Sequence, residues 1–376
     1  MRDFLNALLK RYDLHDVDLS VIVDGVLVGR GIATDDPTRF DEQSLYRVAS
    51  ISKLFVATAV LRAWEQGHLQ LDDDIRTHLP YVPRNPHHPD VPITLRMLLS
   101  HASSIADGSH YWINPSESLV DLFNSPDNLD KFMTFATIDG QHPAPGERFF
   151  YCNVGYILLA AVLETVTNER FDEHIKTHIL TPLGMSGGFT VNTIEPRHRI
   201  VPLYRREQGH WVAQFDQTPQ QMDFRQYQLG TNPTPMAPQG GLRANTLELA
   251  KFVPVLLGER PDILMASTLK NMTSIAHQDT VWHPWETYGL GIHILDPRDP
   301  WVPSGDYPRS LHGHTGVAYG LNAMFYLDLD TKNGVIFAAT GEGRPRSDYE
   351  RDNAILLAFQ QDVLTFVRTT YWTEKK

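Results

Sequence analysis

"RVASISKLFVATAV", residues 47–60, places Ser50 and Lys53 three positions apart, directly before an apolar run that predicts a buried helix. Residues at this spacing share one face of a helix, so the hydroxyl and the amine are expected to be neighbours. A lysine in a dry cleft has a lowered pKa and can accept the proton of a serine. The competing interpretation is that Ser50 only caps the start of the helix.

Length and composition narrow the class of protein. The chain has 376 residues, of which 42% are hydrophobic and 21% charged, so it can bury a substantial core and form two lobes around a cleft. The net charge of -12 argues against a nucleic-acid partner. One cysteine excludes an intrachain disulfide. No apolar run is long enough for a membrane span, and residues 1–16 lack the apolar core of a secretory signal, so a cytoplasmic protein without a membrane partner is expected.

Secondary-structure patterns at the two ends of the chain match each other. Residues 17–34 predict a β-hairpin with its turn at Asp24-Gly25, and residues 321–343 predict another with its turn at Lys332-Asn333-Gly334. Helical patterns flank these hairpins at 2–12 and 349–371. In the middle of the chain, the pattern predicts helices over 53–66, 93–100, 117–137 and 154–182. Residues 195–240 show no clear pattern and are expected to be rich in loops.

Two further motifs carry chemical groups that a serine enzyme can use. Tyr151 and Asn153 form the Y-x-N of "FFYCNVGY", just before an apolar helix. The phenol can move a proton, and the asparagine amide can hold a substrate carbonyl. His314, Thr315 and Gly316 stand in "LHGHTGVAYG" at the expected start of a hairpin, where the glycines permit close approach of a substrate.

The three motifs in this order resemble the serine β-lactamase/penicillin-binding-protein superfamily, in its class C-like esterase and D-aminopeptidase branch. Residues 95–108, 143–185 and 238–252 resemble further blocks of that family, so the resemblance covers about 17–360. It implies an α+β fold, β-lactamase/transpeptidase-like, with an antiparallel sheet flanked by helices plus an inserted all-helical lobe. The whole chain, 1–376, is then a single unit. Its α/β lobe comprises about 1–60 and 240–376, and its helical, loop-rich lobe about 61–239.

The resemblance also implies a role for each motif residue. Ser50 resembles the acylated nucleophile, Lys53 its base, and Tyr151 the residue that protonates the leaving group. Asn153 resembles a substrate contact. The substrate-binding strand is expected to include His314, Thr315, Gly316 and Val317, and the backbone N–H groups of Ser50 and Val317 resemble an oxyanion hole.

Some positions depart from the family pattern. His314 stands where lysine is usual, and a neutral imidazole attracts a substrate carboxylate less than an ammonium does. This favours esters, amides or D-amino acid derivatives over penicillin-like ligands. Ser104 replaces a usual glycine, which affects the expected shape of its loop. Ser267, in a second S-x-x-K, falls between the motifs and is interpreted as a decoy.

Other side chains are assigned structural or lining roles. His101 is expected to serve structure, as its counterpart does in the family, and Cys152 to be a packing residue. Four aromatic residues are candidates to line the cleft: Trp112, Trp282, Trp285 and Tyr288. No metal-ligand spacing such as H-E-x-x-H appears, so neither a metal nor a cofactor is expected.

Three functional hypotheses follow. The first is a serine hydrolase of esters or amides that works through an acyl-enzyme, with D-amino acid amides and peptides among its candidate substrates. The second is an acyltransferase of secondary metabolism that passes the same acyl group to an amine or alcohol. The third is a catalytically silent binding protein on this fold. In the enzyme hypotheses the partner is a small-molecule ester, amide or acyl acceptor; the oligomeric state stays open.

Overall fold

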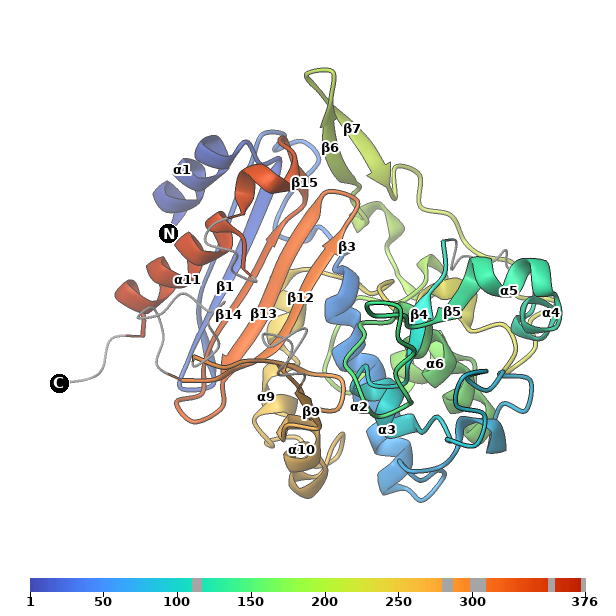
Figure 1. Cartoon of the computed structure of the whole chain (residues 1–376). Coiled ribbons are helices and arrows are strands. Elements are labelled where there is room, and N and C mark those ends of the chain that lie inside the picture. The colour runs from blue at the N-terminus through green and yellow to red at the C-terminus, as the bar shows by residue number, and fades with distance from the viewer. Residues whose placement is uncertain (110–116, 279–286, 298–308, 351–355, 373–376) are drawn as a thin grey trace.

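An eight-stranded antiparallel sheet forms one side of the molecule in the computed structural model, which describes residues 1–109, 117–278, 287–297, 309–350 and 356–372 (Figure 1). The strand order is β2-β1-β14-β13-β12-β11-β10-β9. The strands of this sheet are β1 (Asp16–Val23), β2 (Val26–Thr34), β9 (His277–Gln278), β10 (Thr287–Tyr288), β11 (His293–Leu295), β12 (Leu311–Ala318), β13 (Leu321–Asp328) and β14 (Asn333–Ala339).

Three smaller sheets and eleven α-helices accompany the large sheet in the described residues, joined by short 3₁₀ turns and loops. The minor strand pairings are β3 (Tyr46–Arg47) with β8 (Arg243–Ala244), β4 (Ile105–Asp107) with β5 (Met133–Phe135), and β15 (Gly341–Glu342) with β6 (Leu203–Glu207) and β7 (His210–Phe215). The helices are α1 (Arg2–Tyr12), α2 (Ser52–Glu65), α3 (Leu95–Leu99), α4 (Leu119–Asn124), α5 (Pro126–Phe132), α6 (Asn153–Thr167), α7 (Phe171–Ile175), α8 (Thr246–Ala250), α9 (Val253–Leu256), α10 (Ala266–Thr273) and α11 (Ala358–Thr370).

The two terminal hairpins join within the large sheet, where β1 and β14 are its second and third strands. β1 pairs with β14 from Val17 opposite Ala339 to Ile22 opposite Gly334. The first turn is where the sequence predicts it, with positive φ angles at Asp24 and Gly25. The second turn lies slightly earlier than predicted, because Asn333 already belongs to β14 and residues 329–332 make the turn. The antiparallel sheet built from both chain ends is therefore confirmed.

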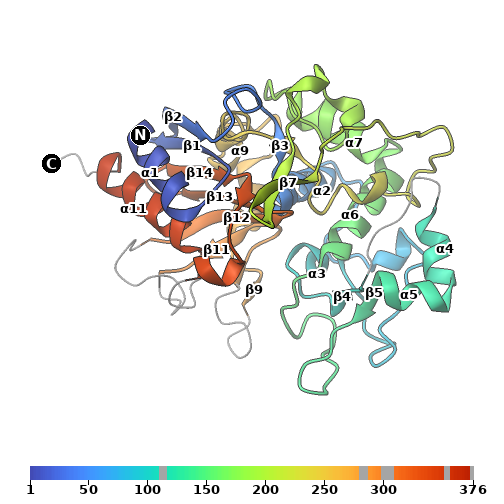
Figure 2. The same ribbon diagram turned by 90° about the horizontal axis from the view of Figure 1, so that it is seen from above.

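Both faces of this sheet are buried, which explains the nearly continuous apolar runs in its central strands. Helices α1 and α11 cover one face, and α2 with the middle of the chain lies on the other (Figure 2). Alternate residues of β14 point into different cores: Phe337 packs with the terminal helices, and Ile336 with α2 and α6. The α+β class with a sheet between helical layers is thus confirmed.

The middle of the chain is more varied than the predicted all-helical lobe. The helix expected over 117–137 breaks at Ser125 into α4 and α5, and β5 follows directly after α5. The segment 195–240 contains the hairpin β6–β7, whose turn uses positive φ angles at Gln208 and Gly209. Its strands alternate weakly because much of the hairpin is exposed, so the periodicity that reveals a buried strand is absent.

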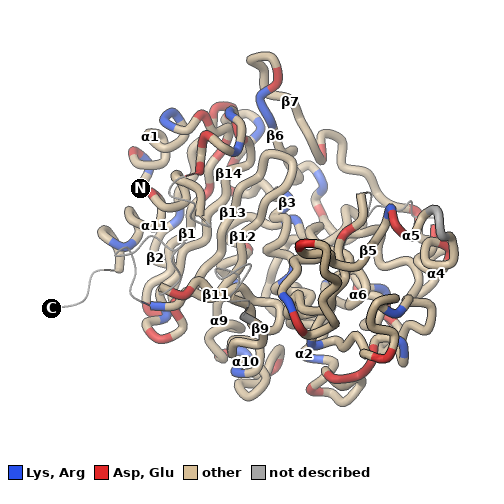
Figure 3. The backbone as a smooth tube through the Cα atoms, in the orientation of Figure 1, with Lys and Arg blue, Asp and Glu red and all other residues tan. Residues whose placement is uncertain are grey.

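Charged residues gather in loops, helix surfaces and strand ends, and the central strands of the sheet carry few (Figure 3). None of the helices in the described ranges combines the length and the apolar character needed to cross a bilayer.

Candidate active site

Ser50 lies in the short 3₁₀ turn η1 (Ala49–Ile51), between β3 and α2. A glycine on β12 allows that strand to approach this turn closely. A Cβ at Gly316 would lie 2.3 Å from Val48 O, whereas one at Gly240 would make only an ordinary contact with the Ala49 backbone, at 3.5 Å. The turn itself uses a left-handed Ala49, with φ 47°. Such strain is common at functional sites and persists where the surroundings over-determine it.

The three predicted catalytic side chains meet around the Ser50 hydroxyl. Lys53 Nζ lies 3.1 Å from Ser50 Oγ, and Tyr151 OH lies 2.8 Å from the same oxygen. Lys53 is fully buried on the first turn of α2, whereas Ser50 is only partly buried. The hydroxyl can therefore be reached from solvent while its neighbouring amine is kept dry.

The surroundings of Lys53 favour the neutral amine. Burial lowers its pKa from 10.5 to about 7, and the more distant Asp107 carboxylate offsets part of this effect. Besides Ser50 Oγ, the amine contacts Asn153 Oδ1 at 2.8 Å and the Gln239 carbonyl at 2.7 Å. Those two oxygens can only accept. A neutral amine that gives them its two protons has its lone pair left for the Ser50 hydroxyl.

Asp107 is a site residue that the motif analysis missed. Its carboxylate accepts hydrogen bonds from Asn153 Nδ2 at 2.7 Å and from the backbone N–H groups of Asn153 and Val154 at 2.8 and 2.9 Å. It thus fixes the start of α6 and turns Asn153 Oδ1 toward Lys53. The sequence offers no signal for this role, because Asp107 lies in a three-residue strand and meets α6 only in the fold.

His101 packs against the ring of Tyr151. Its ring stacks on that of Tyr151, with 4.3 Å between centroids, and its Nδ1 accepts a hydrogen bond from the Cys152 N–H at 3.1 Å. Burial holds the pKa of His101 well below its ordinary value, so the ring is neutral. Cys152 is buried at the start of α6, and burial raises the pKa of its thiol. The environments of both residues agree with the structural roles expected for them.

His314 lies on β12 at the wall of the site and is a neutral imidazole. Its Nδ1 donates a hydrogen bond to the Thr315 carbonyl at 2.6 Å, and burial lowers its pKa well below the ordinary value. Its Nε2 faces Tyr288 OH at 3.5 Å. The position that is usually a lysine in this family therefore adds no positive charge to the cleft.

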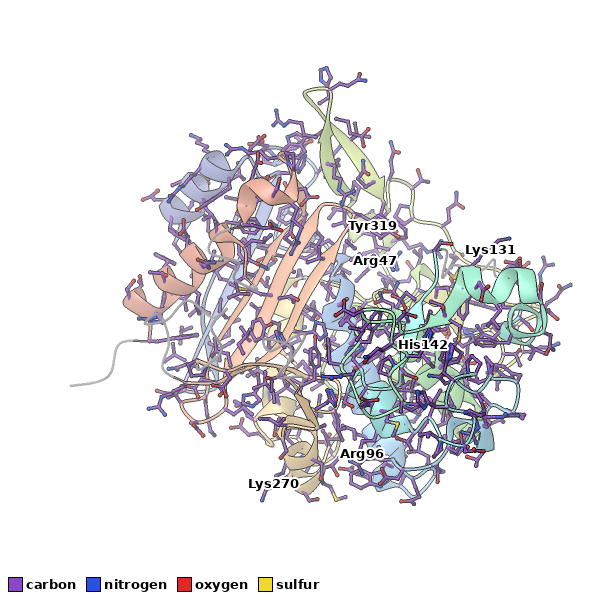
Figure 4. All side chains as sticks on the ribbon, viewed as in Figure 1. Arg47, Arg96, Lys131, His142, Lys270 and Tyr319 are labelled. Atoms are coloured by element: carbon purple, nitrogen blue, oxygen red, sulfur yellow. The ribbon has the colours of Figure 1, made fainter. Side chains whose placement is uncertain are left out.

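These groups open into a cleft of about 550 Å³. The described residues that line it are Arg47, Ala49, Ser50, Tyr151, Asn153, Arg205, Gln239, Gly240, Tyr288, His293, His314, Thr315, Val317, Ala318 and Tyr319. Arg47 and Tyr319 lie at the end where β12 meets the segment before α2 (Figure 4), and the Arg47 guanidinium is 5.6 Å from the Tyr319 ring centroid. Arg205 comes from the unpredicted hairpin β6–β7.

The structure brings together all of the predicted site residues. Ser50, Tyr151 and Asn153 face His314, Thr315 and Val317 across the cleft; Lys53 lies beneath Ser50, and Gly316 forms the close contact with Val48. Ser267, by contrast, is exposed on α10, far along the chain from these motifs. Tyr288 lines the cleft; the other three aromatic candidates, Trp112, Trp282 and Trp285, lie outside the described residues.

Comparison with known proteins identifies the family. Residues 1–360 match the Beta-lactamase family. Protein flp of Staphylococcus aureus (strain MRSA252) is 28% identical over 168 residues, which are 44% of this chain and 32% of that protein. Penicillin-binding protein 4 of Amycolatopsis lactamdurans is 27% identical over 197 residues, 52% of this chain and 47% of that protein. The matches span about a third to a half of these curated relatives.

Solved structures show the same fold at low sequence identity. The octameric penicillin-binding protein homologue from Pyrococcus abyssi aligns with a TM-score of 0.72 at 22% identity, over 98% of this chain and 76% of that chain. The D-amino acid amidase from Ochrobactrum anthropi SV3, complexed with L-phenylalanine amide, aligns with a TM-score of 0.71 at 18% identity, over 99% and 98%.

The chain belongs to the Beta-lactamase family. The family expected from the motifs is therefore confirmed.

Proposed function

We propose that this protein hydrolyses small esters or amides through an acyl-enzyme on Ser50. The observation that carries the proposal is the convergence of Lys53 Nζ and Tyr151 OH on the Ser50 hydroxyl, at 3.1 and 2.8 Å, in an open cleft. A nucleophile beside a dry base and a second proton carrier is the arrangement that acyl transfer requires.

The proposed steps are built on the contacts of Ser50 Oγ with Lys53 Nζ and Tyr151 OH. Ser50 Oγ attacks the substrate carbonyl carbon as its proton passes to the neutral Lys53 amine. The bond to the leaving group then breaks, and that alcohol or amine departs with the proton of Tyr151, which leaves a phenolate near the Lys53 ammonium. Water next attacks the acyl carbon and gives a proton to the Tyr151 phenolate. Ser50 Oγ then departs with the proton held by Lys53, which releases the acid and restores all three side chains.

The backbone is proposed to stabilise the oxyanion of the tetrahedral intermediates. The N–H groups assigned to this role belong to Ser50 in η1 and to Val317 on β12. The close approach of Gly316 to Val48 supports this assignment, because it holds β12 against the turn that carries Ser50. Two such donors contribute several kcal/mol of transition-state stabilisation in acyl-transfer enzymes.

Hydrolysis is proposed ahead of acyl transfer because Ser50 is partly exposed and the cleft is open, so water can reach an acyl group there. Amides are included among the substrates because two proteins of similar fold are titled D-amino acid amidase and D-stereospecific amidohydrolase. The neutral His314 favours acyl groups that do not depend on a strong carboxylate contact. D-phenylalanine amide, L-phenylalanine amide and p-nitrophenyl acetate are suitable first substrates, because together they separate amide from ester hydrolysis and the D from the L enantiomer.

Covalent labelling tests the proposal directly. The full chain is incubated with a fluorophosphonate probe or p-nitrophenyl acetate, and the intact mass is measured. We expect one adduct on Ser50 that is absent in Ser50→Ala, with turnover reduced about 10⁴-fold or more. Ser267→Ala is the matched control, since it removes the serine of the second S-x-x-K and is expected to keep both labelling and turnover.

Failure to label the wild-type protein, or labelling that survives Ser50→Ala, would contradict the acyl-enzyme and favour a silent binding protein. Product analysis with and without amine and alcohol acceptors then separates the two enzyme hypotheses. If only the free acid forms with every acceptor tested, the result supports the hydrolase. If the acyl group passes mainly to the added amine or alcohol in aqueous buffer, the result would overturn it.

A further inference from the structure

A carboxylate and two imidazoles converge near the end of α6, outside the cleft. Glu169 Oε2 lies 2.8 Å from His174 Nδ1 and 2.9 Å from His178 Nε2. All three potential donor atoms lie within 4.8 Å of one another, and no other such group of three occurs in the described part of the chain.

Local backbone structure explains why these side chains meet. α6 ends at Thr167, and its capping residue Asn168 has a left-handed φ of 57°, a turn that places Glu169 beside the next helix. His174 and His178 are four residues apart, so they share one helix face, and their ring centroids are 4.4 Å apart. α7 continues after Ile175 into a π-helical turn over Lys176–Leu180. Turns of this kind are rare and frequently occur at functional sites.

We propose that Glu169, His174 and His178 bind one divalent transition-metal ion, with Zn²⁺ the best match. Two imidazole nitrogens and one carboxylate oxygen are a donor set that zinc prefers, whereas Mg²⁺ and Ca²⁺ prefer oxygen ligands alone. Side-chain exposure is 7% for His174, 44% for Glu169 and 32% for His178. One ligand is thus anchored in the protein, and solvent can supply the fourth ligand.

Small movements suffice to admit the ion. Zinc–ligand bonds of about 2.0–2.2 Å in a tetrahedron place the donor atoms roughly 3.3–3.5 Å apart. The contacts of Glu169 Oε2 with the two imidazole nitrogens are about half an ångström shorter, so Glu169 and His178 must move slightly outward, and their exposure permits this. The ion replaces the two imidazole protons that otherwise point at a single carboxylate oxygen.

The proposed ion has a structural role, separate from the chemistry proposed for Ser50. The site adjoins the C-terminal end of α6, while Asn153 at the other end belongs to the cleft. A helix of this length spans about 22 Å. The ion would link the C-terminal end of α6 to α7 and the turn that follows it. This inference does not depend on the proposed hydrolysis.

Zinc titration of the full chain tests the site. Isothermal calorimetry and metal analysis after dialysis are expected to give one equivalent of Zn²⁺, with no comparable binding of Mg²⁺. Glu169→Gln and His178→Ala are each expected to weaken zinc binding by about tenfold or more. His198→Ala, which removes an exposed histidine outside the cluster, is the matched control and is expected to leave binding unchanged.

Glu169→Gln also separates a metal site from a purely polar cluster, because the amide oxygen can still accept from one ring. We expect this variant to keep the metal-free melting temperature and to lose the rise that Zn²⁺ produces in the wild type. Absence of a stoichiometric zinc equivalent, or affinity that is equal in wild type, Glu169→Gln and His178→Ala, would overturn the proposal.

Discussion

A lysine carries a positive charge at neutral pH in most protein settings, and the environment of Lys53 disfavours that charge. The amine is fully buried, and two of its three contacts are oxygens that can only accept. Burial brings its pKa to about 7. The S-x-x-K spacing predicts that Lys53 lies near Ser50, but the protonation state depends on Gln239 and on desolvation, which only the folded chain supplies.

The pH dependence of turnover follows from this pKa. Lys53 acts as a base only when neutral, and its lowered pKa means that the neutral form predominates above about pH 7. We expect kcat/KM for a neutral ester to rise about tenfold per pH unit below pH 7 and to level off above it. The measurement is a pH profile from 5.5 to 9 with p-nitrophenyl acetate, corrected for uncatalysed hydrolysis. A flat profile between pH 6 and 8 would contradict the assignment of Lys53.

Ser104 shows how a departure from the family pattern can be accommodated. The residue adopts a left-handed φ of 60°, which explains why glycine is usual at this position. Its hydroxyl accepts a hydrogen bond from Asn85 Nδ2 at 3.0 Å, and this contact offsets part of the conformational cost. The loop that leads to Asp107 therefore keeps its shape without the glycine.

At the scale of elements, the packing of β12 against η1 positions both sides of the cleft. The contact is backbone against backbone at Gly316 and Val48. The sequence predicts that Gly316 permits close approach by a substrate, and the structure shows a close approach to Val48, directly before the turn that carries Ser50.

Gly316→Ala tests this packing. Its Cβ would lie 2.3 Å from Val48 O, a distance that forces β12 away from η1. We expect a loss of about 3 kcal/mol in the free energy of unfolding and at least a tenfold loss of turnover. Urea denaturation and ester hydrolysis measure the two effects.

Gly29→Ala on β2 is the matched control for that substitution. Its nearest neighbour is the flexible end of the Met1 side chain, at 3.2 Å, so a small change in both quantities is expected. Wild-type turnover in Gly316→Ala would show that the contact does not position the site.

At the scale of the whole molecule, one hydrophobic core joins the sheet to the middle of the chain. It includes Phe325 and Ile336 from the sheet, Val60 from α2 and Leu163 from α6. The division into an α/β lobe and a helical lobe stays a prediction, and this shared core indicates that such lobes would not unfold independently.

We therefore expect a single cooperative unfolding transition. Far-ultraviolet circular dichroism and tryptophan fluorescence should give the same midpoint in urea, and Leu163→Ala should shift both together, by about 2–5 kcal/mol in the free energy of unfolding. Two separate transitions, or a shift confined to one probe, would contradict a shared core.

The sequence by itself determined the hairpins at the chain ends, the helix after Ser50 and the identity of the motif residues, because local periodicity and turn chemistry act over a few positions. Tertiary structure alone decided the Asp107 contacts, the lowered pKa of Lys53 and the placement of the hairpin β6–β7 at the cleft. Those features depend on burial and on contacts between distant segments, and neither is written in the spacing of residues along the chain.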